Sequence, residues 1–253
     1  MTPELYLPFV LTFLLSFKHA MDGDHLLATS NYIVRSKSIT ESLKVTSFWV
    51  AGHQTSSIPF ATVALLLATQ ILPIENVIDV IVGCMMIFLG AVFLMSDFGL
   101  LRTIIHEHPH SHSTEEIHQH PHPHRFWPLS SLVHWFHRHK HAQLYAIGTV
   151  HGLASNDEMM ATFAILLGLI AVGGFDLVNI SIIVAIYTIG LLAGMFTFAT
   201  LLSGGVRRSA NFPKLFKGIR VSAEALTLTY GIMMLLGLEG FNLIGTLFNI
   251  EPG

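Results

Sequence analysis

Two histidines, two aspartates and a lysine lie within eight consecutive positions, between two apolar stretches. The segment reads KHAMDGDHLL over residues 18–27. Charged groups at membrane depth cost at least ~2.5–3.5 kcal/mol each on insertion scales, and they are usually functional. Imidazole and carboxylate groups together are suitable ligands for a divalent transition metal. The residues that carry this chemistry are Lys18, His19, Asp22, Asp24 and His25.

The spacing places three of these residues on one face of a regular helix. His19, Asp22 and His25 lie at about 0°, 300° and 240°, whereas Asp24 lies at about 140°. Gly23 would permit a local unwinding that turns all four side chains to one point, and transporters use interrupted helices in this way. We interpret the motif as a site for a metal ion or for protons. The alternative is a salt-bridged polar pair that locks two helices together.

Two further histidines lie in apolar segments outside this motif. His53, in FWVAGHQTSSI, is either a third metal ligand, a gate residue or a source of interhelical hydrogen bonds. His151 opens HGLASNDEMMAT, whose polar residues would complete the coordination or carry protons. Lys18 is either a counter-ion for a carboxylate or a participant in the transport cycle. The polar residues after His151 are Asn156, Asp157 and Glu158.

Twelve of the sixteen histidines lie between residues 97 and 141. Proline and charge argue against a packed structure there, and a His-rich composition indicates loose metal binding. We therefore expect a disordered cytoplasmic loop that captures metal. His106–His110 matches H-E-x-x-H, but Pro109 argues against the continuous helix that a zinc hydrolase requires, so we expect no enzyme. The candidate capturing residues are His106, His108, His110, His112, His118, His120, His122 and His124.

The composition is that of a chain embedded in lipid. Of 253 residues, 52% are hydrophobic and only 11% are charged, against about 25% charged in soluble domains. Six stretches are long enough to span a bilayer, which predicts an all-α integral membrane protein with about six transmembrane helices. A single cysteine, Cys84, excludes a disulfide framework and a dithiol relay. The predicted helices cover residues 4–33, 44–70, 74–96, 142–172, 176–203 and 219–247.

The charge distribution predicts the topology. Twelve of the thirteen Lys and Arg residues lie in or beside the first, third and fifth loops, which the positive-inside rule places in the cytoplasm. We expect a multi-pass plasma-membrane protein with both termini outside, a retained first helix and no nucleic-acid partner. DGDHLLAT at 22–29 aligns with SNDEMMAT at 155–162, which suggests a 3+3 inverted repeat. The parts are then a transmembrane half at 1–96, the His-rich loop at 97–141, and a second half at 142–253.

Residues 19–26, HAMDGDHL, resemble the signature of the nickel/cobalt transporter family, His-Ala-x-Asp-Ala-Asp-His-Ile. Residues 48–54 are similar to a second family motif, and 156–162 echo a third only loosely. A fourth motif finds Gly194 and Met195, with Ala199 where the family has an aspartate. The chain is also shorter than the eight-helix members. The resemblance implies a secondary transporter with Ni²⁺ or Co²⁺ as its substrate and no resident cofactor, and it implies a metal-binding core of His19, Asp22, Asp24 and His25.

Three functions are open at this point. The first is alternating access around a metal site in the membrane, with uptake favoured over efflux. The second is efflux, in which the His-rich loop traps metal in the cytoplasm. The third is a membrane metal sensor or chaperone that does not transport. An intracellular metallochaperone is a candidate partner, beside the divalent ion and the lipid bilayer.

Overall fold

The computed structural model describes residues 6–67, 72–100, 105–110, 118–123, 140–154, 161–162, 165, 177–209 and 211–237. Within these residues the chain forms seven named helices and one two-stranded ladder. The helices are α1 (Tyr6–His19), α2 (Gly23–Ile33), α3 (Ile39–Leu67), α4 (Leu72–Asp97), α6 (Lys140–Ala154), α8 (Leu177–Ser209) and α9 (Pro213–Leu235). The strands are β1 (Ile105–His110) and β2 (His118–Pro123).

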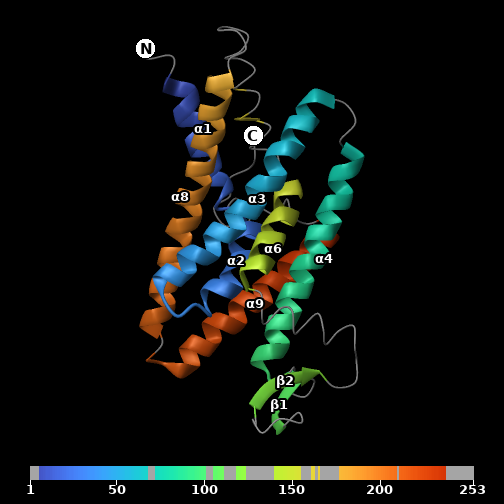
Figure 1. The fold of residues 1–253 in the computed structure, drawn as a ribbon, viewed down its shortest axis with the longest axis vertical. Coiled ribbons are helices and arrows are strands. Elements are labelled where there is room, and N and C mark those ends of the chain that lie inside the picture. The colour runs from blue at the N-terminus through green and yellow to red at the C-terminus, as the bar shows by residue number, and fades with distance from the viewer. Residues whose placement is uncertain are drawn as a thin grey trace, which may run out of the picture.

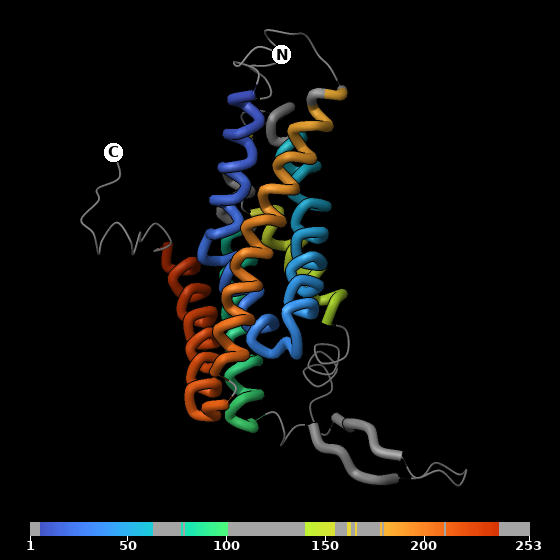
Figure 2. The backbone as a smooth tube through the Cα atoms, turned by 90° about the vertical axis from the view of Figure 1, so that its left-hand side faces the viewer, coloured from blue at the N-terminus to red at the C-terminus, as the bar shows by residue number. Residues whose placement is uncertain are grey.

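The helices form an elongated bundle in which three pairs pack closely, α1 with α8, α3 with α6, and α4 with α9 (Figures 1 and 2). Glycine permits each of these approaches. A Cβ atom at Gly148 would lie 2.0 Å from the carbonyl oxygen of Trp49, and one at Gly90 would lie 2.6 Å from the amide of Leu228. Gly190 makes the same kind of contact between α8 and α1. Small residues at helix contacts are typical of membrane bundles.

The pairing pattern bears on the predicted inverted repeat. Exchanging the two predicted halves maps the α1–α8 pair onto the α6–α3 pair and maps the α4–α9 pair onto itself. Two related halves that meet around a two-fold axis produce such a set of contacts, whichever their relative orientation. The repeat itself stays a prediction, as does the number of six membrane spans.

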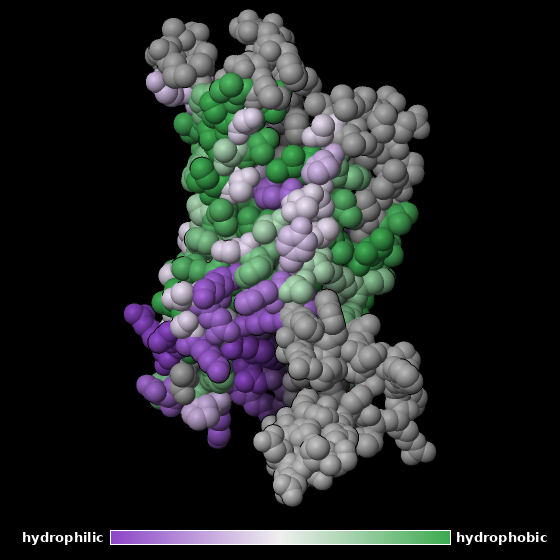
Figure 3. Space-filling model, viewed as in Figure 1, coloured by the Kyte–Doolittle hydropathy of each residue, from purple (hydrophilic) through white to green (hydrophobic). Residues whose placement is uncertain are grey.

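The surface of the bundle is rich in apolar side chains (Figure 3). Among the described residues, two helical stretches are long and apolar enough to cross a membrane, Asp79–Asp97 and Ile180–Ser209. Soluble proteins rarely expose large continuous apolar patches, so this surface supports a membrane protein. Large exposed apolar side chains lie on α1, α4 and α8 and include Leu7, Val10, Leu14, Val77, Val80, Ile81, Val178, Ile189 and Leu201.

Hydrophilic residues gather at one end of the bundle, the lower end in Figure 3. The α2–α3 connection and the α8–α9 connection both lie there (Figure 1). We call it the basic end, and its exposed basic residues are Lys37, Lys44, Arg207, Arg208, Lys214 and Lys217. Two of the three connections that the sequence predicts to share one side of the membrane therefore lie at one end of the molecule.

Two helices begin several residues earlier than the hydropathy predicts. The amide of Glu41 donates to the Ser38 hydroxyl at 3.0 Å, a capping contact that starts α3 at Ile39. Pro213 occupies the first turn of α9, where proline is favoured because its missing N–H would have no partner there. After Leu235 the chain leaves the helix through Gly237, at φ 65°, a conformation that favours glycine at helix ends.

Part of the His-rich loop has regular backbone structure. β1 and β2 pair antiparallel, with His106 opposite His122, His108 opposite His120 and His110 opposite His118. The sequence predicts a disordered loop here, so the ladder is a difference from that expectation. Both segments place histidine at every second position, and two residues is the repeat of a β-strand.

Candidate metal site

The first predicted membrane helix, residues 4–33, is two helices with a break at residues 20–22. Asp22 has extended backbone angles, φ −65° and ψ 144°, and precedes the first residue of α2. Gly23 packs beside Tyr230, because a Cβ atom there would lie 3.0 Å from that ring. The break therefore ends at Asp22, and α2 begins at Gly23. It changes the direction of the chain between His19 and His25, so a continuous-helix geometry no longer applies to them.

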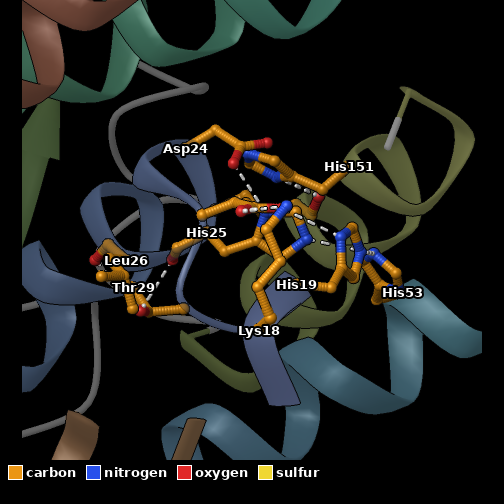
Figure 4. A network of polar contacts seen from close by, with 10 residues as sticks. Lys18, His19, Asp24, His25, Leu26, Thr29, His53 and His151 are labelled. Atoms are coloured by element: carbon orange, nitrogen blue, oxygen red, sulfur yellow. Dashed lines mark hydrogen bonds and ion pairs between the residues drawn. The ribbon is translucent and has the colours of Figure 1, made fainter. Parts of the chain in front are cut away.

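Three imidazoles meet at this break (Figure 4). His19 lies at the end of α1, His25 in the first turn of α2, and His53 in the middle of α3. The Nε2 atom of His53 is 3.4 Å from Nε2 of His19 and 3.3 Å from Nε2 of His25. One nitrogen from each of the three residues lies within 4.8 Å of the other two, and all three side chains are buried. This group, which the α1–α2 break and the α3 helix assemble, is the candidate metal site.

The two aspartates contact the far side of two of these rings. Nδ1 of His19 lies 3.0 Å from Oδ2 of Asp22, and Nδ1 of His25 lies 2.7 Å from Oδ1 of Asp24. Carboxylates in this position accept the Nδ1–H and orient the ring, as they do behind the histidine ligands of many metal sites. The sequence and the family resemblance predict Asp22 and Asp24 as ligands. In this geometry they lie behind the imidazoles.

The hydrogen bonds to Asp22 and Asp24 leave nitrogen lone pairs of the imidazoles pointing toward the centre of the site. When His19 and His25 donate from Nδ1 to carboxylates, their Nε2 atoms become acceptors. Both face Nε2 of His53, which has at most one proton and cannot donate fully to two acceptors. Two nitrogens bound to one ion at about 2.0–2.1 Å in tetrahedral geometry are roughly 3.3–3.4 Å apart. A cation placed among the three nitrogens would interact favourably with all of them.

A fourth imidazole, that of His151 on α6, lies beside the three. Its ring centroid is 5.7 Å from that of His25 and 5.7 Å from that of Trp49. Nδ1 of His151 donates to the carbonyl of Ile147 at 3.0 Å, and its buried Nε2 has no hydrogen-bond partner in the described part of the chain. We call His19, His25, His53 and His151 the His cluster.

Glycine packing between α3 and α6 brings His53 and His151 together. Gly148 and Gly152 flank His151 in a G-x-x-x-G pattern, and a Cβ atom at Gly152 would lie 2.2 Å from the carbonyl oxygen of His53. Ser56 also donates to the carbonyl of Thr149 across the interface at 2.7 Å. Any side chain at these glycines would separate the two helices and with them the two imidazoles.

The other predicted site residues are distributed outside this centre. Lys18 is 65% exposed and lies 3.7 Å from Asp22, which places it at the edge of the site. Asn156, Asp157 and Glu158 lie outside the described residues, as do His112 and His124. His106, His108, His110, His118, His120 and His122 lie on the two strands.

Two features of the structure are not predicted from the sequence. Trp49 forms an aromatic wall, with ring centroids 4.8 Å from His25 and 5.0 Å from His53. Its position four residues before His53, on the same face of α3, was a signal for it. The second feature lies outside the metal site and is a group of charged residues near the basic end. The sequence indicated it through acidic residues in apolar helices, such as Asp97 and Glu224.

Comparison with known proteins gives one partial relative. A urease accessory protein, UreH, from Bacillus sp. strain TB-90 is 31% identical over 102 residues. The match covers 40% of this chain and 42% of that protein, so it spans less than half of either. No family model matches the chain, and no solved structure matches it.

Proposed function

We propose that this chain is a secondary transporter that moves Ni²⁺, or Co²⁺, across the cytoplasmic membrane, with net uptake. The observation that carries the proposal is the meeting of three buried imidazoles at a break in a helix. Interrupted helices that bind the substrate inside the bundle are a recurring design of secondary transporters. The ion would enter from the end opposite the basic end and leave at the basic end.

The chemistry of the His cluster supports a transition metal as the substrate. Imidazole nitrogen suits nickel, copper, zinc and iron, whereas magnesium and calcium prefer oxygen. The choice of nickel or cobalt rests on two further findings, the HAMDGDHL resemblance and the partial match to a protein named for its service to urease. The apolar surface of the bundle supports a location in a membrane.

Bound metal and protons compete for the same nitrogens, which supports coupling between them. A metal-ligating histidine must be neutral, so acidification releases the ion. We propose that the ion exchanges for protons in this way, so that the His cluster releases metal on the side where its histidines become protonated. The histidines of the β1–β2 region would capture ions at the mouth of the transporter, and a ladder of many weak ligands raises the local concentration without setting specificity.

The test is Ni²⁺ flux into proteoliposomes in which the protein has a known orientation. His25→Ala should abolish flux, because it removes one of three converging nitrogens. His141→Ala is the matched control, since this histidine lies on α6 and stacks on Phe48 with centroids 4.4 Å apart. A deletion of residues 105–123 should lower the rate and leave transport in place.

Three results would contradict the proposal. Flux that persists in His25→Ala would remove the His cluster from the pathway. Ni²⁺ binding without flux, retained in His25→Ala and lost with residues 105–123, would favour a sensor or chaperone. Net outward movement along an imposed pH gradient would retain the transporter and replace uptake by efflux.

A further inference from the structure

Four charged side chains meet where α2, α4 and α9 come together near the basic end (Figure 1). Arg35 follows the end of α2, Asp97 ends α4, and Arg220 and Glu224 lie one turn apart on α9. An Nη atom of Arg35 lies 3.1 Å from Asp97, and the same guanidinium pairs with Glu224. Nε of Arg220 donates to Asp97 at 2.9 Å. We call these residues the ion-pair cluster.

Arg35 is the member that crosses from one group of helices to another. Its guanidinium also donates to the carbonyl of Asn31 at 2.9 Å and lies 4.4 Å from the centroid of Phe93. It therefore contacts α2, α4 and α9 at once. Arg220, in contrast, pairs with Asp97 across the α4–α9 interface alone. Removing Arg35 would leave α2 without a charged contact to either of these helices among the described residues.

The acidic members are buried although they are charged. The side chain of Asp97 is 4% exposed and that of Glu224 is 0% exposed, whereas the two guanidiniums are 22% and 27% exposed. Oε2 of Glu224 has no hydrogen-bond partner within the described residues. Buried ion pairs are weak stabilisers compared with well-packed apolar groups. The charged side chains of this interface can take up water when it separates, and the neighbouring contact between Tyr32 and Phe93, at 5.2 Å between ring centroids, is apolar.

A strip of polar contacts connects this cluster to the metal site. Asn31 donates to the hydroxyl of Thr227 at 2.9 Å, and that hydroxyl lies 3.2 Å from the carbonyl of Leu27 and 2.8 Å from the carbonyl of Ala223 on its own helix. These contacts join α2 to α9 between His25 and Arg35. The ten residues from His25 to Arg35 correspond to roughly 15 Å along a helix. The α2–α9 interface thus has polar contacts between the His cluster and the basic end, beside the packing of Gly23 against the Tyr230 ring.

The α4–α9 interface is built differently. A Cβ atom at Gly231 would lie 2.7 Å from the carbonyl oxygen of Gly83, and Gly90 packs against the backbone of Leu228. Helices this close cannot slide without clashes. We therefore expect α4 and α9 to move as one unit, with α2 as the element that separates from them.

We propose that the ion-pair cluster is the gate between the His cluster and the basic end, closed in this structure by Arg35. The inference rests on the proposed transport function. When Arg35 leaves Asp97 and Glu224, α2 separates from α9, and the freed carboxylate of Glu224 faces the divalent cation as it passes. Arg220 stays with Asp97 and holds it in place on the α4–α9 side.

The test measures access to the α2–α9 interface. In a Cys84→Ser background, Thr227→Cys places a thiol at a fully buried position in the polar strip. A membrane-impermeant maleimide is then added to oriented vesicles from the basic-end side or from the opposite side. Arg35→Gln should raise labelling from the basic-end side at least about fivefold and leave labelling from the other side unchanged. Arg220→Gln, the matched control, removes the same charge without cutting the α2 contact and should raise it less than twofold.

Nickel binding in detergent separates failure of this inference from failure of the transport function. Arg35→Gln should bind Ni²⁺ within about twofold of the parent protein, which also shows that the variant is folded. Arg35→Lys, which keeps a positive charge facing Asp97 and Glu224, should keep labelling near the parent level. Equal labelling of Arg35→Gln and Arg220→Gln, or no change in either, would reduce the cluster to a structural lock. A parent protein that binds Ni²⁺ without flux would instead refute the transport function.

Discussion

The His cluster and the ion-pair cluster are both buried polar groups, and α2 or the residues just after it contribute to each, through His25 and through Arg35. They differ in whether the cluster contains its own cations. Beside the His cluster, carboxylates accept hydrogen bonds from the outer nitrogens of His19 and His25, so the inner nitrogens of these rings face His53 as acceptors. In the ion-pair cluster, two guanidiniums already face two carboxylates. The His cluster therefore favours binding of a cation at its centre, whereas the carboxylates of the ion-pair cluster are already paired with the cationic side chains of Arg35 and Arg220.

This difference indicates which of the two can bind a substrate. An ion binds where the side chains interact more favourably with it than with one another. The converging imidazole nitrogens of His19, His25 and His53 meet that condition. The carboxylate of Glu224 becomes available only when Arg35 moves, and that of Asp97 stays paired with Arg220. Binding and gating are therefore assigned to different regions, and each assignment can be tested separately.

Removing a central imidazole should have the largest effect. His53→Ala should weaken Ni²⁺ binding by more than about 100-fold, because loss of an outer partner alone typically costs 10–100-fold. Isothermal titration calorimetry in detergent measures this. Glu224→Gln, in the other cluster, should change the affinity less than about twofold. If both variants lose affinity alike, the contrast between the two clusters is wrong.

A substitution that separates α3 from α6 should have the second-largest effect. Gly148→Ala places a Cβ atom against the backbone carbonyl of Trp49, and overpacking of this kind costs about 3 kcal/mol at the upper end of its range. We expect a lower melting temperature together with weaker Ni²⁺ binding. Gly204→Ala, where a Cβ atom meets nothing within 4 Å, should be neutral or stabilising. A normal affinity in Gly148→Ala would show that this interface does not position the imidazoles.

Substitution of Asp24 should have an intermediate effect on Ni²⁺ affinity. Asp24→Asn leaves the shape of the contact to His25 and weakens its acceptor, so we expect a 10–100-fold loss of Ni²⁺ affinity. The same titration measures it. A loss as large as that of His53→Ala would instead make Asp24 a direct ligand, as the sequence predicts.

A half-buried ion pair should have the smallest effect. Lys140 donates to Glu41 at 2.8 Å, and this hydrogen bond lowers the pKa of Glu41 below its ordinary value of 4.5. The pair therefore stabilises the fold above that pKa, and its contribution is lost as the pH falls through the folded-state value. Glu41→Gln should lower stability at pH 7 by about 0.2–1 kcal/mol. Thermal unfolding measured stepwise from pH 7 downward checks this, and a difference between the variants that does not shrink as the pH falls would contradict it.

The sequence by itself determined the helical class, the polar residues inside apolar helices and the clustering of basic residues. Each of these depends on composition and on local spacing, which the chain carries whatever its fold. The interruption near Gly23 was also readable, because glycine between two aspartates weakens a helix locally. His19, His25, His53 and His151 are likewise identifiable from the sequence, because each is a polar residue in an otherwise apolar segment.

Only the tertiary structure decided how these residues meet. Spacing on a regular helix puts Asp22 beside His19 and His25, but the break turns the chain and places Asp22 and Asp24 behind the rings. The meeting of His53 with His25, and of Arg35 with Glu224, joins residues 28 and 189 positions apart. No local pattern specifies such contacts, because they depend on which helices pack together and on how closely their glycines allow the backbones to approach.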